Sequence, residues 1–374
     1  MELYLMKTKP LMQTNSETIP DLLLRPAIIA TPDKLQKASP GDKFADLWAL
    51  ITRGESVLLT GTYGFAMSFY SWLKKRILTD YPVHNYEQAR IYREIWHTYS
   101  QRVLVGVKDH KVELSKSVEN PWLKLFYPDN ANFLITWPDY LGLNGARQWY
   151  EKGIQYPMLA HRIHPFYGTY FPTRNEHLLL FDKWLKTTTK PEKALDIGTG
   201  CGVISFILHA HGVRNIHATD INPNAIFSLN QELEKLGEPY KQSIYPIQKS
   251  FFGGFKASVN DLVVFNPPWI PGKAEKSMDQ ACYFDGGFFD AFFRQADTQC
   301  ETGAQIVLLF SDYAVVSRQT DTHPLTTAIS SHSHIIDLID HISEPVKQKP
   351  AKKKSWLDDI RSREHIELFV LRKK

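Results

Sequence analysis

The run Asn266-Pro267-Pro268-Trp269 combines residue types that can hold a flat nitrogen group. It follows the apolar segment 261–265, which predicts a buried strand. Two successive prolines fix an extended turn and remove two N–H donors, so carbonyl groups of the turn are left to face a ligand. The carbonyls of Asn266 (side chain) and Pro267 (main chain) can accept two N–H groups, and Trp269 can lie against an amide or a base. We expect Asn266, Pro267 and Trp269 to be catalytic and Pro268 to contact substrate; the alternative is a rigid proline corner capped by a core tryptophan.

The segment 193–206, KALDIGTGCGVISF, predicts a strand, a glycine turn and a helix. Main-chain N–H groups can approach a ligand closely at glycines, which here are Gly198, Gly200 and Gly202. Asp196, at the strand end, disfavours a pyrophosphate and favours a cationic ligand. Asp220 ends the next strand, one βαβ step later, where an acidic residue reaches ribose hydroxyls. The two segments together predict a site for a nucleoside without phosphates.

These motifs resemble those of a known family. LDIGTGCGVISF followed by ATDINPNAI is similar to the first two motifs of class I S-adenosylmethionine-dependent methyltransferases, and the Asn-Pro-Pro-aromatic run resembles members that methylate glutamine amides or the exocyclic amines of adenine and guanine. The resemblance implies S-adenosylmethionine as cofactor, S-adenosylhomocysteine as product, and direct methyl transfer without a metal. It implies cofactor contacts from Asp196, Gly198, Thr199, Gly200, Gly202, Asp220, Ile221 and Asn266. Where the family has an acidic residue near adenine, this chain offers Ser250 or Phe251.

Two further segments resemble the enzymes that methylate a glutamine in translation release factors. FPTRNEHLLL is similar to their proline-arginine-proline-glutamate segment, although Asn175 replaces the second proline, and FDGGFFD is similar to their loop after the Asn-Pro-Pro motif. The resemblance makes Arg174 and Glu176 candidate substrate contacts. An ordinary ion pair at the start of a helix is an equally good interpretation of these two residues.

A sheet of parallel strands must position these motifs. Apolar runs predict strands near 194–197, 215–219, 243–248, 261–265 and 305–310, and IIDLIDHI and EHIELFVLRK predict a final antiparallel hairpin. Helices are predicted at 175–185, with Leu178, Leu179, Phe181, Trp184 and Leu185 buried, and at 224–236. We therefore expect an α/β fold, a Rossmann-like, seven-stranded, mostly parallel sheet over residues 155–374.

The first 154 residues predict a smaller, mixed and mostly helical domain for substrate recognition. After a loosely ordered lead-in of about 40 residues, helical patterns begin at 41, 66 and 86, and short strands are expected at 102–107 and 131–137. Aromatic stripes on these helices are typical of a helix core. We find no catalytic constellation in this part of the chain.

Composition limits the class of protein. Of 374 residues, 43% are hydrophobic and 22% charged, which is ordinary for a globular chain. No run approaches the ~20 apolar residues of a membrane span, no secretory leader is evident, and three widely spaced cysteines argue against a disulfide framework or a zinc site. A cytoplasmic protein without membrane partners is expected. The net charge of +4 does not require a nucleic-acid partner.

Three functions stay open. We prefer N-methylation of a glutamine side-chain amide in a protein, although Trp269 replaces the usual tyrosine and the N-terminal part is unlike that of the release-factor enzymes. The second is N-methylation of a base amine in RNA or DNA, for which Trp269 would stack on the base. The lysine-rich run from Lys347 to Lys354 would then contact phosphate, and is otherwise a solvated loop. The third is a cofactor-binding scaffold that has lost catalysis.

Overall fold

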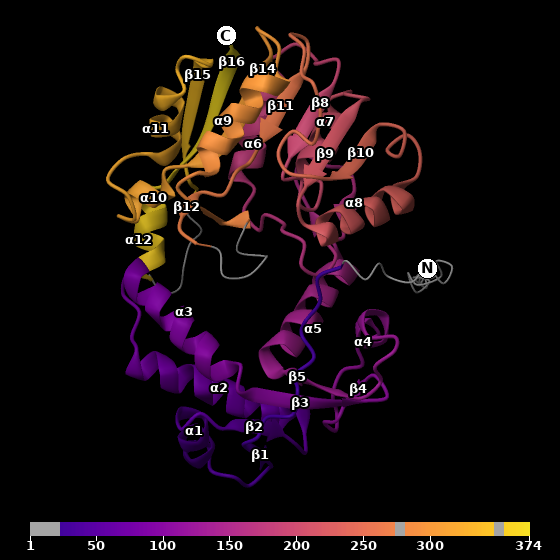
Figure 1. Ribbon diagram of the computed structural model, residues 1–374, viewed down its shortest axis with the longest axis vertical. Helices are drawn as coiled ribbons and strands as arrows, with labels where there is room; N and C mark the ends of the chain where they lie inside the picture. Colours follow the sequence, from indigo (N-terminus) through magenta and orange to yellow (C-terminus); the bar gives the residue numbers. More distant parts are fainter. Residues whose placement is uncertain (1–22, 274–280, 348–354) are drawn as a thin grey trace, which may run out of the picture.

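The computed structural model describes residues 23–273, 281–347 and 355–374, and it contains two main sheets that lie in different parts of the chain (Figure 1). The expectations for residues 1–22 and for most of the lysine-rich run lie outside the described residues. In Figure 1 the N-terminal sheet lies at the bottom and the C-terminal sheet at the top.

The C-terminal sheet has seven strands in the order β10-β9-β8-β11-β14-β16-β15. The strands are β8 (Ala194–Ile197), β9 (Ile216–Asp220), β10 (Ile244–Gln248), β11 (Leu262–Phe265), β14 (Gln305–Ser311), β15 (Ile336–Pro345) and β16 (His365–Lys373). β8 to β11 and β14 pair in parallel, whereas β16 is antiparallel to both of its neighbours. The sheet is therefore mixed and Rossmann-like, and the expected C-terminal hairpin is present.

The chain order reverses between β8 and β11, which are neighbours in the sheet. At such a switch point the loops after the two strands diverge, and ligands of open α/β sheets bind in the crevice between them. The loop after β8 is the glycine turn, and the loop after β11 is the Asn-Pro-Pro-Trp run. The fold alone thus brings together two motifs that lie about 65 residues apart in the sequence.

Helices connect the strands of this sheet. They are α6 (Glu176–Leu185), α7 (Val203–Ala210), α8 (Pro223–Leu236), α9 (Phe288–Gln299), α10 (Tyr313–Val316), α11 (Pro324–Ser331) and α12 (Trp356–Arg363). The helix α6 corrects one expectation, because Leu179 is 39% exposed whereas Leu180 is buried. On a helix of 3.6 residues per turn, Leu179 lies opposite the middle of the buried arc, which consists of His177, Leu178, Leu180, Phe181, Trp184 and Leu185.

The N-terminal sheet has five strands, in the order β1-β2-β3-β4 with β5 also paired to β3. The strands are β1 (Leu35–Ala38), β2 (Ser56–Leu59), β3 (Val103–Lys108), β4 (Lys111–Val112) and β5 (Phe133–Thr136). The helices are α1 (Phe44–Thr52), α2 (Tyr63–Asp80), α3 (Tyr86–Ser100), α4 (Trp122–Phe126) and α5 (Trp137–Lys152). The sequence missed β1 and β2 because a strand of four residues carries little periodic signal.

The two parts of the chain touch at separate places. On one side, Nη1 of Arg93 in α3 donates to the hydroxyl of Tyr283 at 2.7 Å, and Tyr283 belongs to β13 (Tyr283–Phe284), which pairs with β12 (Ile270–Pro271) directly after Trp269. On the other, the hydroxyl of Tyr150 in α5 donates to Gln231 in α8 at 3.3 Å. Figure 1 shows α3 and α5 on opposite sides of the region below the C-terminal sheet. The N-terminal part therefore contacts the C-terminal part on both sides of the switch point, and on the α5 side Phe166 and Phe227 also pack into its core cluster.

Candidate functional site

A narrow pocket lies at the switch point, between the glycine turn and the first residue of the Asn-Pro-Pro-Trp run. Its walls include Tyr170, Pro172, His177, Gly198, Thr199 and Asn266. Three of these, Gly198, Thr199 and Asn266, were expected from the sequence to contact the cofactor. Asn266 stands where β11 ends and Gly198 where β8 ends, so the pocket is the place where a ligand on the glycine turn would meet a group held by Asn266.

The glycine turn has a backbone conformation that favours glycine at three positions. Gly198, Gly200 and Gly202 have φ angles of 64°, 51° and 82°, a left-handed conformation that other residues rarely adopt. A Cβ on Gly200 would lie 2.7 Å from the carbonyl oxygen of Tyr170, so the chain before α6 closes one side of the turn. The turn therefore has no room for side chains and presents its backbone to the pocket.

Asp196 is fully buried directly beneath the turn. Its Oδ2 accepts three hydrogen bonds, from the hydroxyl of Thr199 at 2.7 Å and from the hydroxyl and main-chain N–H of Ser205 at 2.7 and 3.0 Å. Its Oδ1 has no partner among the described residues. Burial raises the pKa of Asp196 to about 6, against the effect of these donors. A buried carboxylate oxygen without a donor fits a cationic ligand, as the sequence suggested.

Asp220 joins the turn to the next loop. Its Oδ2 accepts from the main-chain N–H of Gly200 at 2.9 Å and its Oδ1 from that of Asn222 at 2.9 Å, and burial raises its pKa. Each oxygen retains a lone pair for a further donor such as a sugar hydroxyl. Beside it Ile221 is 54% exposed, which leaves an apolar surface next to the carboxylate.

The two candidates for an adenine contact differ in their surroundings. Ser250 is exposed. Phe251 is partly buried with a left-handed φ of 45°, and its carbonyl accepts from the hydroxyl of Thr219 at 2.6 Å. Its ring lies 6.1 Å from that of Phe265, the last residue of β11. This backbone conformation costs energy for a residue other than glycine, and it is held by contacts with the strands on both sides of the pocket.

Trp269 orients Asn266. Its indole N–H is shared between the side-chain Oδ1 of Asn266 and the carbonyl oxygen of Leu309, each at 3.2 Å. The sequence predicted that the Asn266 oxygen accepts an N–H group of the substrate, and it did not predict the hydrogen bond from Trp269. An amide oxygen accepts two hydrogen bonds, so one lone pair remains for a ligand. Pro267 and Pro268 are buried, which fixes the turn that carries both side chains.

Arg174 and Glu176 form the ion pair that was the alternative to substrate contact. Nη2 of Arg174 lies 3.5 Å from Glu176, and its Nη1 donates to Glu364 at 2.9 Å. Glu364 is buried, accepts also from the hydroxyl of Ser311 at 2.9 Å, and stands just before β16. The sequence did not indicate Glu364, because it lies far along the chain and belongs to no motif. Arg174 therefore ties the start of α6 to the C-terminal hairpin.

His177 is the residue of this pocket that sequence reasoning missed. It is 2% exposed, and its Nε2 has no hydrogen-bond partner among the described residues. Burial lowers the pKa of its imidazole to about 4, so the ring is neutral at pH 7. Its ring meets that of Trp269 edge to face at 5.3 Å. The only signal in the sequence is its place on the buried stripe of α6, which by itself is typical of a core histidine.

The site fits the cofactor that the resemblance implies. S-adenosylmethionine carries a cationic sulfonium, an ammonium group and a ribose, with no phosphate. The open backbone of the glycine turn, the unpartnered oxygen of Asp196 and the remaining lone pairs of Asp220 match these groups. These three features were found in the sequence, and the structure places them around one turn.

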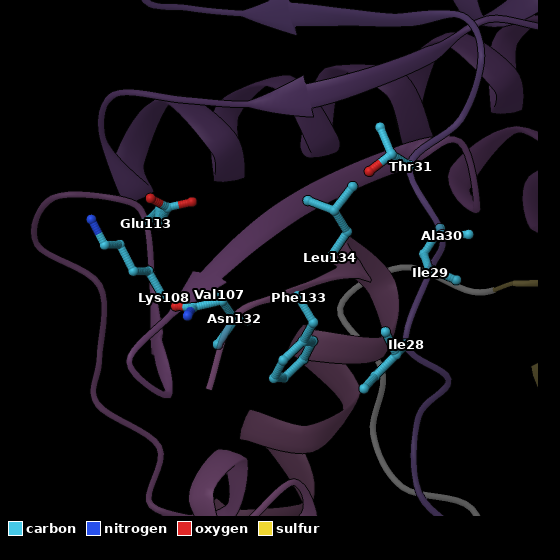
Figure 2. A pocket seen from close by; sticks show the side chains of 10 residues that line it. All are labelled: Ile28, Ile29, Ala30, Thr31, Val107, Lys108, Glu113, Asn132, Phe133 and Leu134. Carbon is cyan, nitrogen blue, oxygen red and sulfur yellow. The ribbon is translucent and has the colours of Figure 1, made fainter. Parts of the chain in front are cut away.

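A second hollow, of about 520 Å³, lies in the N-terminal part between residues 28–31 and strands β3 and β5 (Figure 2). It is wider than the pocket at the switch point, but its lining is mostly apolar. Figure 2 shows Lys108 and Glu113 together at one end, and Ile28 and Phe133 at the other. We assign the chemistry to the pocket at the switch point, because it is lined by Gly198 of the glycine turn and by His177, whose buried Nε2 has no hydrogen-bond partner among the described residues.

Over residues 23–273, 281–347 and 355–374, no group of three or more histidine, cysteine, aspartate or glutamate side chains is arranged to hold a metal ion. Among the helices of those same residues, none is long and apolar enough to cross a membrane.

The known proteins that this chain resembles are methyltransferases. Residues 178–310 match the family model "Methyltransferase small domain", a range that includes the glycine turn and the Asn-Pro-Pro-Trp run. The chain is 28% identical over 157 residues to a "Putative protein N5-glutamine methyltransferase" of Methanocaldococcus jannaschii, covering 40% of this chain and 75% of that protein. It is 24% identical over 135 residues to a tRNA1(Val) (adenine(37)-N6)-methyltransferase of Edwardsiella ictaluri, covering 35% of this chain and 55% of that protein.

Among solved structures, a ribosomal protein L11 methylase of Lactobacillus delbrueckii subsp. bulgaricus aligns with 60% of this chain and 93% of its own, at 17% identity and a TM-score of 0.37. The evidence for the fold is the strand order and pairing of the sheet itself.

Proposed function

We propose that this chain, which is a class I S-adenosylmethionine-dependent methyltransferase, transfers the methyl group to a planar nitrogen, and that the nitrogen is the side-chain amide of a glutamine in a protein. The observation that carries the proposal is the meeting of Asn266 and the glycine turn in one pocket. The relative named as an N5-glutamine methyltransferase supports the choice of an amide.

Residues of the turn would hold the cofactor. The backbone of Gly198, Thr199, Gly200 and Gly202 would lie along it, with Asp196 beneath its ammonium group and Asp220 at the ribose. Ile221 and Phe251 would contact the adenine, with Ser250 at its exposed edge. S-adenosylmethionine supplies an activated methyl group and leaves as S-adenosylhomocysteine, and this chemistry needs no metal.

The residues after β11 would hold the target nitrogen. The oxygens of Asn266 and Pro267 would accept its two N–H groups, which leaves the nitrogen lone pair directed at the methyl group. Trp269 fixes the rotation of the Asn266 amide through its N–H, and Pro268 would line the entry. Such a site works by alignment and by fixed dipoles, because the methyl donor is already reactive.

The N-terminal part would recognise the macromolecule that carries the target nitrogen. We place the boundary at residue 154, between α5 and the strands that precede α6. Its attachment through Arg93 to Tyr283 in β13, which pairs with the strand after Trp269, supports a role next to the site. Three widely spaced cysteines fit a reducing cytoplasm as the place of action.

A second candidate is the exocyclic amine of a base in RNA or DNA. A tRNA adenine-N6-methyltransferase is among the relatives, and a base would present the same planar –NH2 group to Asn266 and Pro267. A base would have to be unpaired or flipped to reach a pocket this narrow. Trp269 is only partly buried, so its ring could contact either substrate.

The deciding experiment is transfer of a labelled methyl group from S-adenosylmethionine into a cell extract, with the Asn266→Ala protein as control. Label released by protease supports the amide, and peptide mapping should then find a modified glutamine. Label released by nuclease supports the base. No label above the Asn266→Ala control would support a scaffold that binds the cofactor without catalysis.

A further inference from the structure

His177 stands out among the buried histidines whose Nε2 lacks a partner. His161 and His209 share this property, but neither lines the pocket at the switch point. His177 does line it, together with Gly198 of the glycine turn and Asn266. An unpaired buried nitrogen destabilises the folded protein, and a ligand in the pocket can remove that penalty by supplying a hydrogen bond. The position of His177 therefore indicates a hydrogen-bond partner that arrives with the substrates.

The neighbours of His177 connect it to the target nitrogen. Its ring packs perpendicular to that of Trp269, with the ring centroids 5.3 Å apart, and the N–H of Trp269 holds Asn266. His177 thus lies beside the two side chains that would receive the target group, on the side of the pocket formed by the start of α6.

Methylation of an –NH2 group requires a proton acceptor. As the new N–C bond forms and the C–S bond of the donor breaks, the nitrogen becomes cationic and must lose one of its two protons. The oxygens of Asn266 and Pro267 can accept hydrogen bonds, but amide oxygens are too weakly basic to keep a proton. A separate basic atom is needed close to the nitrogen.

Three of the residues that line the pocket are titratable: Tyr170, Cys201 and His177. Burial raises the pKa of Tyr170 and raises that of Cys201 to about 12, so both already hold their proton at pH 7. The imidazole of His177 is neutral and has a lone pair to offer. It is therefore the basic group that this pocket provides at neutral pH.

We propose that Nε2 of His177 accepts a hydrogen bond from the target nitrogen and takes the proton released when that nitrogen is methylated. This inference rests on the proposed N-methyltransferase function and adds a catalytic residue to it. The imidazolium formed in this buried place then passes its proton to water when the product leaves, because burial disfavours the charged ring.

The test compares His177→Asn and His177→Phe with the wild-type protein and with His209→Asn, which alters a buried, unpartnered histidine outside the pocket. Affinity for S-adenosylmethionine is measured by calorimetry, folding by thermal melting, and methyl transfer in single turnovers at saturating cofactor. Methyl transfer is measured from about pH 6 to about pH 9, and at each pH the concentration of free imidazole is increased. The titratable groups around His177 are Arg174 and Glu176 in its own turn, Tyr170 and Cys201 across the pocket, and Asp196 behind Thr199.

We expect both His177 variants to bind S-adenosylmethionine within about threefold of wild type and to transfer methyl about 100-fold more slowly, while His209→Asn is unaffected. The residual rate of His177→Asn should rise with pH and with the concentration of free imidazole, whereas the wild-type rate should not. Transfer within about threefold of wild type, or a loss that does not respond to added base, overturns the proposal. If the substrate is a nucleic acid and not a protein, nuclease will release the label that the wild-type protein transfers. That outcome contradicts the proposed glutamine substrate and is distinct from a failure of the role proposed for His177.

Discussion

The indole N–H of Trp269 lies 3.2 Å from the side-chain oxygen of Asn266 and equally close to the carbonyl oxygen of Leu309 in β14. Trp269 is thereby fixed to the neighbouring strand of the sheet, and Asn266 is fixed to Trp269. The tryptophan acts on the substrate site through its polar edge as well as through its ring. A substitution that removes the N–H and keeps an aromatic ring therefore separates the contribution of the hydrogen bond from that of the ring.

Trp269→Phe keeps an aromatic face and removes the N–H. We expect turnover to fall about 10-fold, because the Asn266 amide loses a hydrogen bond worth about 0.5 to 1.5 kcal/mol and samples other rotations. Affinity for S-adenosylmethionine should not change. Steady-state rates and calorimetry measure the two quantities, and Trp149→Phe, at an exposed indole, serves as the control. Equal turnover in both variants would show that the N–H is dispensable.

Asn266→Ala should leave the affinity for S-adenosylmethionine nearly intact and reduce turnover by at least about 100-fold, since the amide interacts with the group that is methylated. Calorimetry and transfer of labelled methyl measure these effects. Asn260→Ala is the matched control, because that exposed side chain donates only to Glu192. A wild-type rate in Asn266→Ala would make the residue structural.

Asp220→Ala should weaken binding of S-adenosylmethionine by about 1 to 3 kcal/mol, the cost of losing charge-assisted hydrogen bonds. Part of the loss comes from the N–H of Gly200, which would no longer be held by the carboxylate. Titration calorimetry is the measurement, and Asp182→Ala, which removes a surface carboxylate paired with Lys186, is the control. Unchanged affinity would refute the ribose assignment.

Asp196 should make the stability of the free protein depend on pH. Because burial raises its folded pKa to about 6 from 3.8, the penalty for ionising it is absent below pH 3.8, grows as pH rises, and is complete above about pH 6. Relative to wild type, the free energy of unfolding of Asp196→Asn should therefore improve by about 1 to 3 kcal/mol between pH 4 and pH 7. Urea denaturation at a series of pH values measures it. A difference that is constant with pH contradicts the assignment.

The parts of the site that follow from local sequence could be predicted. A strand, a glycine turn and a helix are read from adjacent residues, and the order of βαβ steps then places Gly200 near Asp220. The same reasoning placed Asn266 at the end of a strand. Each of these depends on backbone conformation within a few residues, which composition and spacing encode directly.

Contacts between distant segments could not be predicted. Arg174 pairs with Glu364 across 190 residues, and no property of either residue indicates the other. His177 looks like a core histidine until the strand order places Trp269 beside it. The helix α6 was located correctly, but Leu179 was assigned to the wrong face, because a run of three leucines has no polar residue to mark the solvent side.

The N-terminal part meets the C-terminal part differently on the two sides of the switch point. Beside α5 the contact is a packed apolar one, because Phe166 and Phe227 join the core cluster of the N-terminal part. Beside α3 the contact is polar, through the hydrogen bond that Arg93 donates to Tyr283. Partly exposed polar contacts open at a lower free energy than a buried apolar core does. Any hinge between the two parts would therefore lie on the α5 side, and the α3 side would be the one to open.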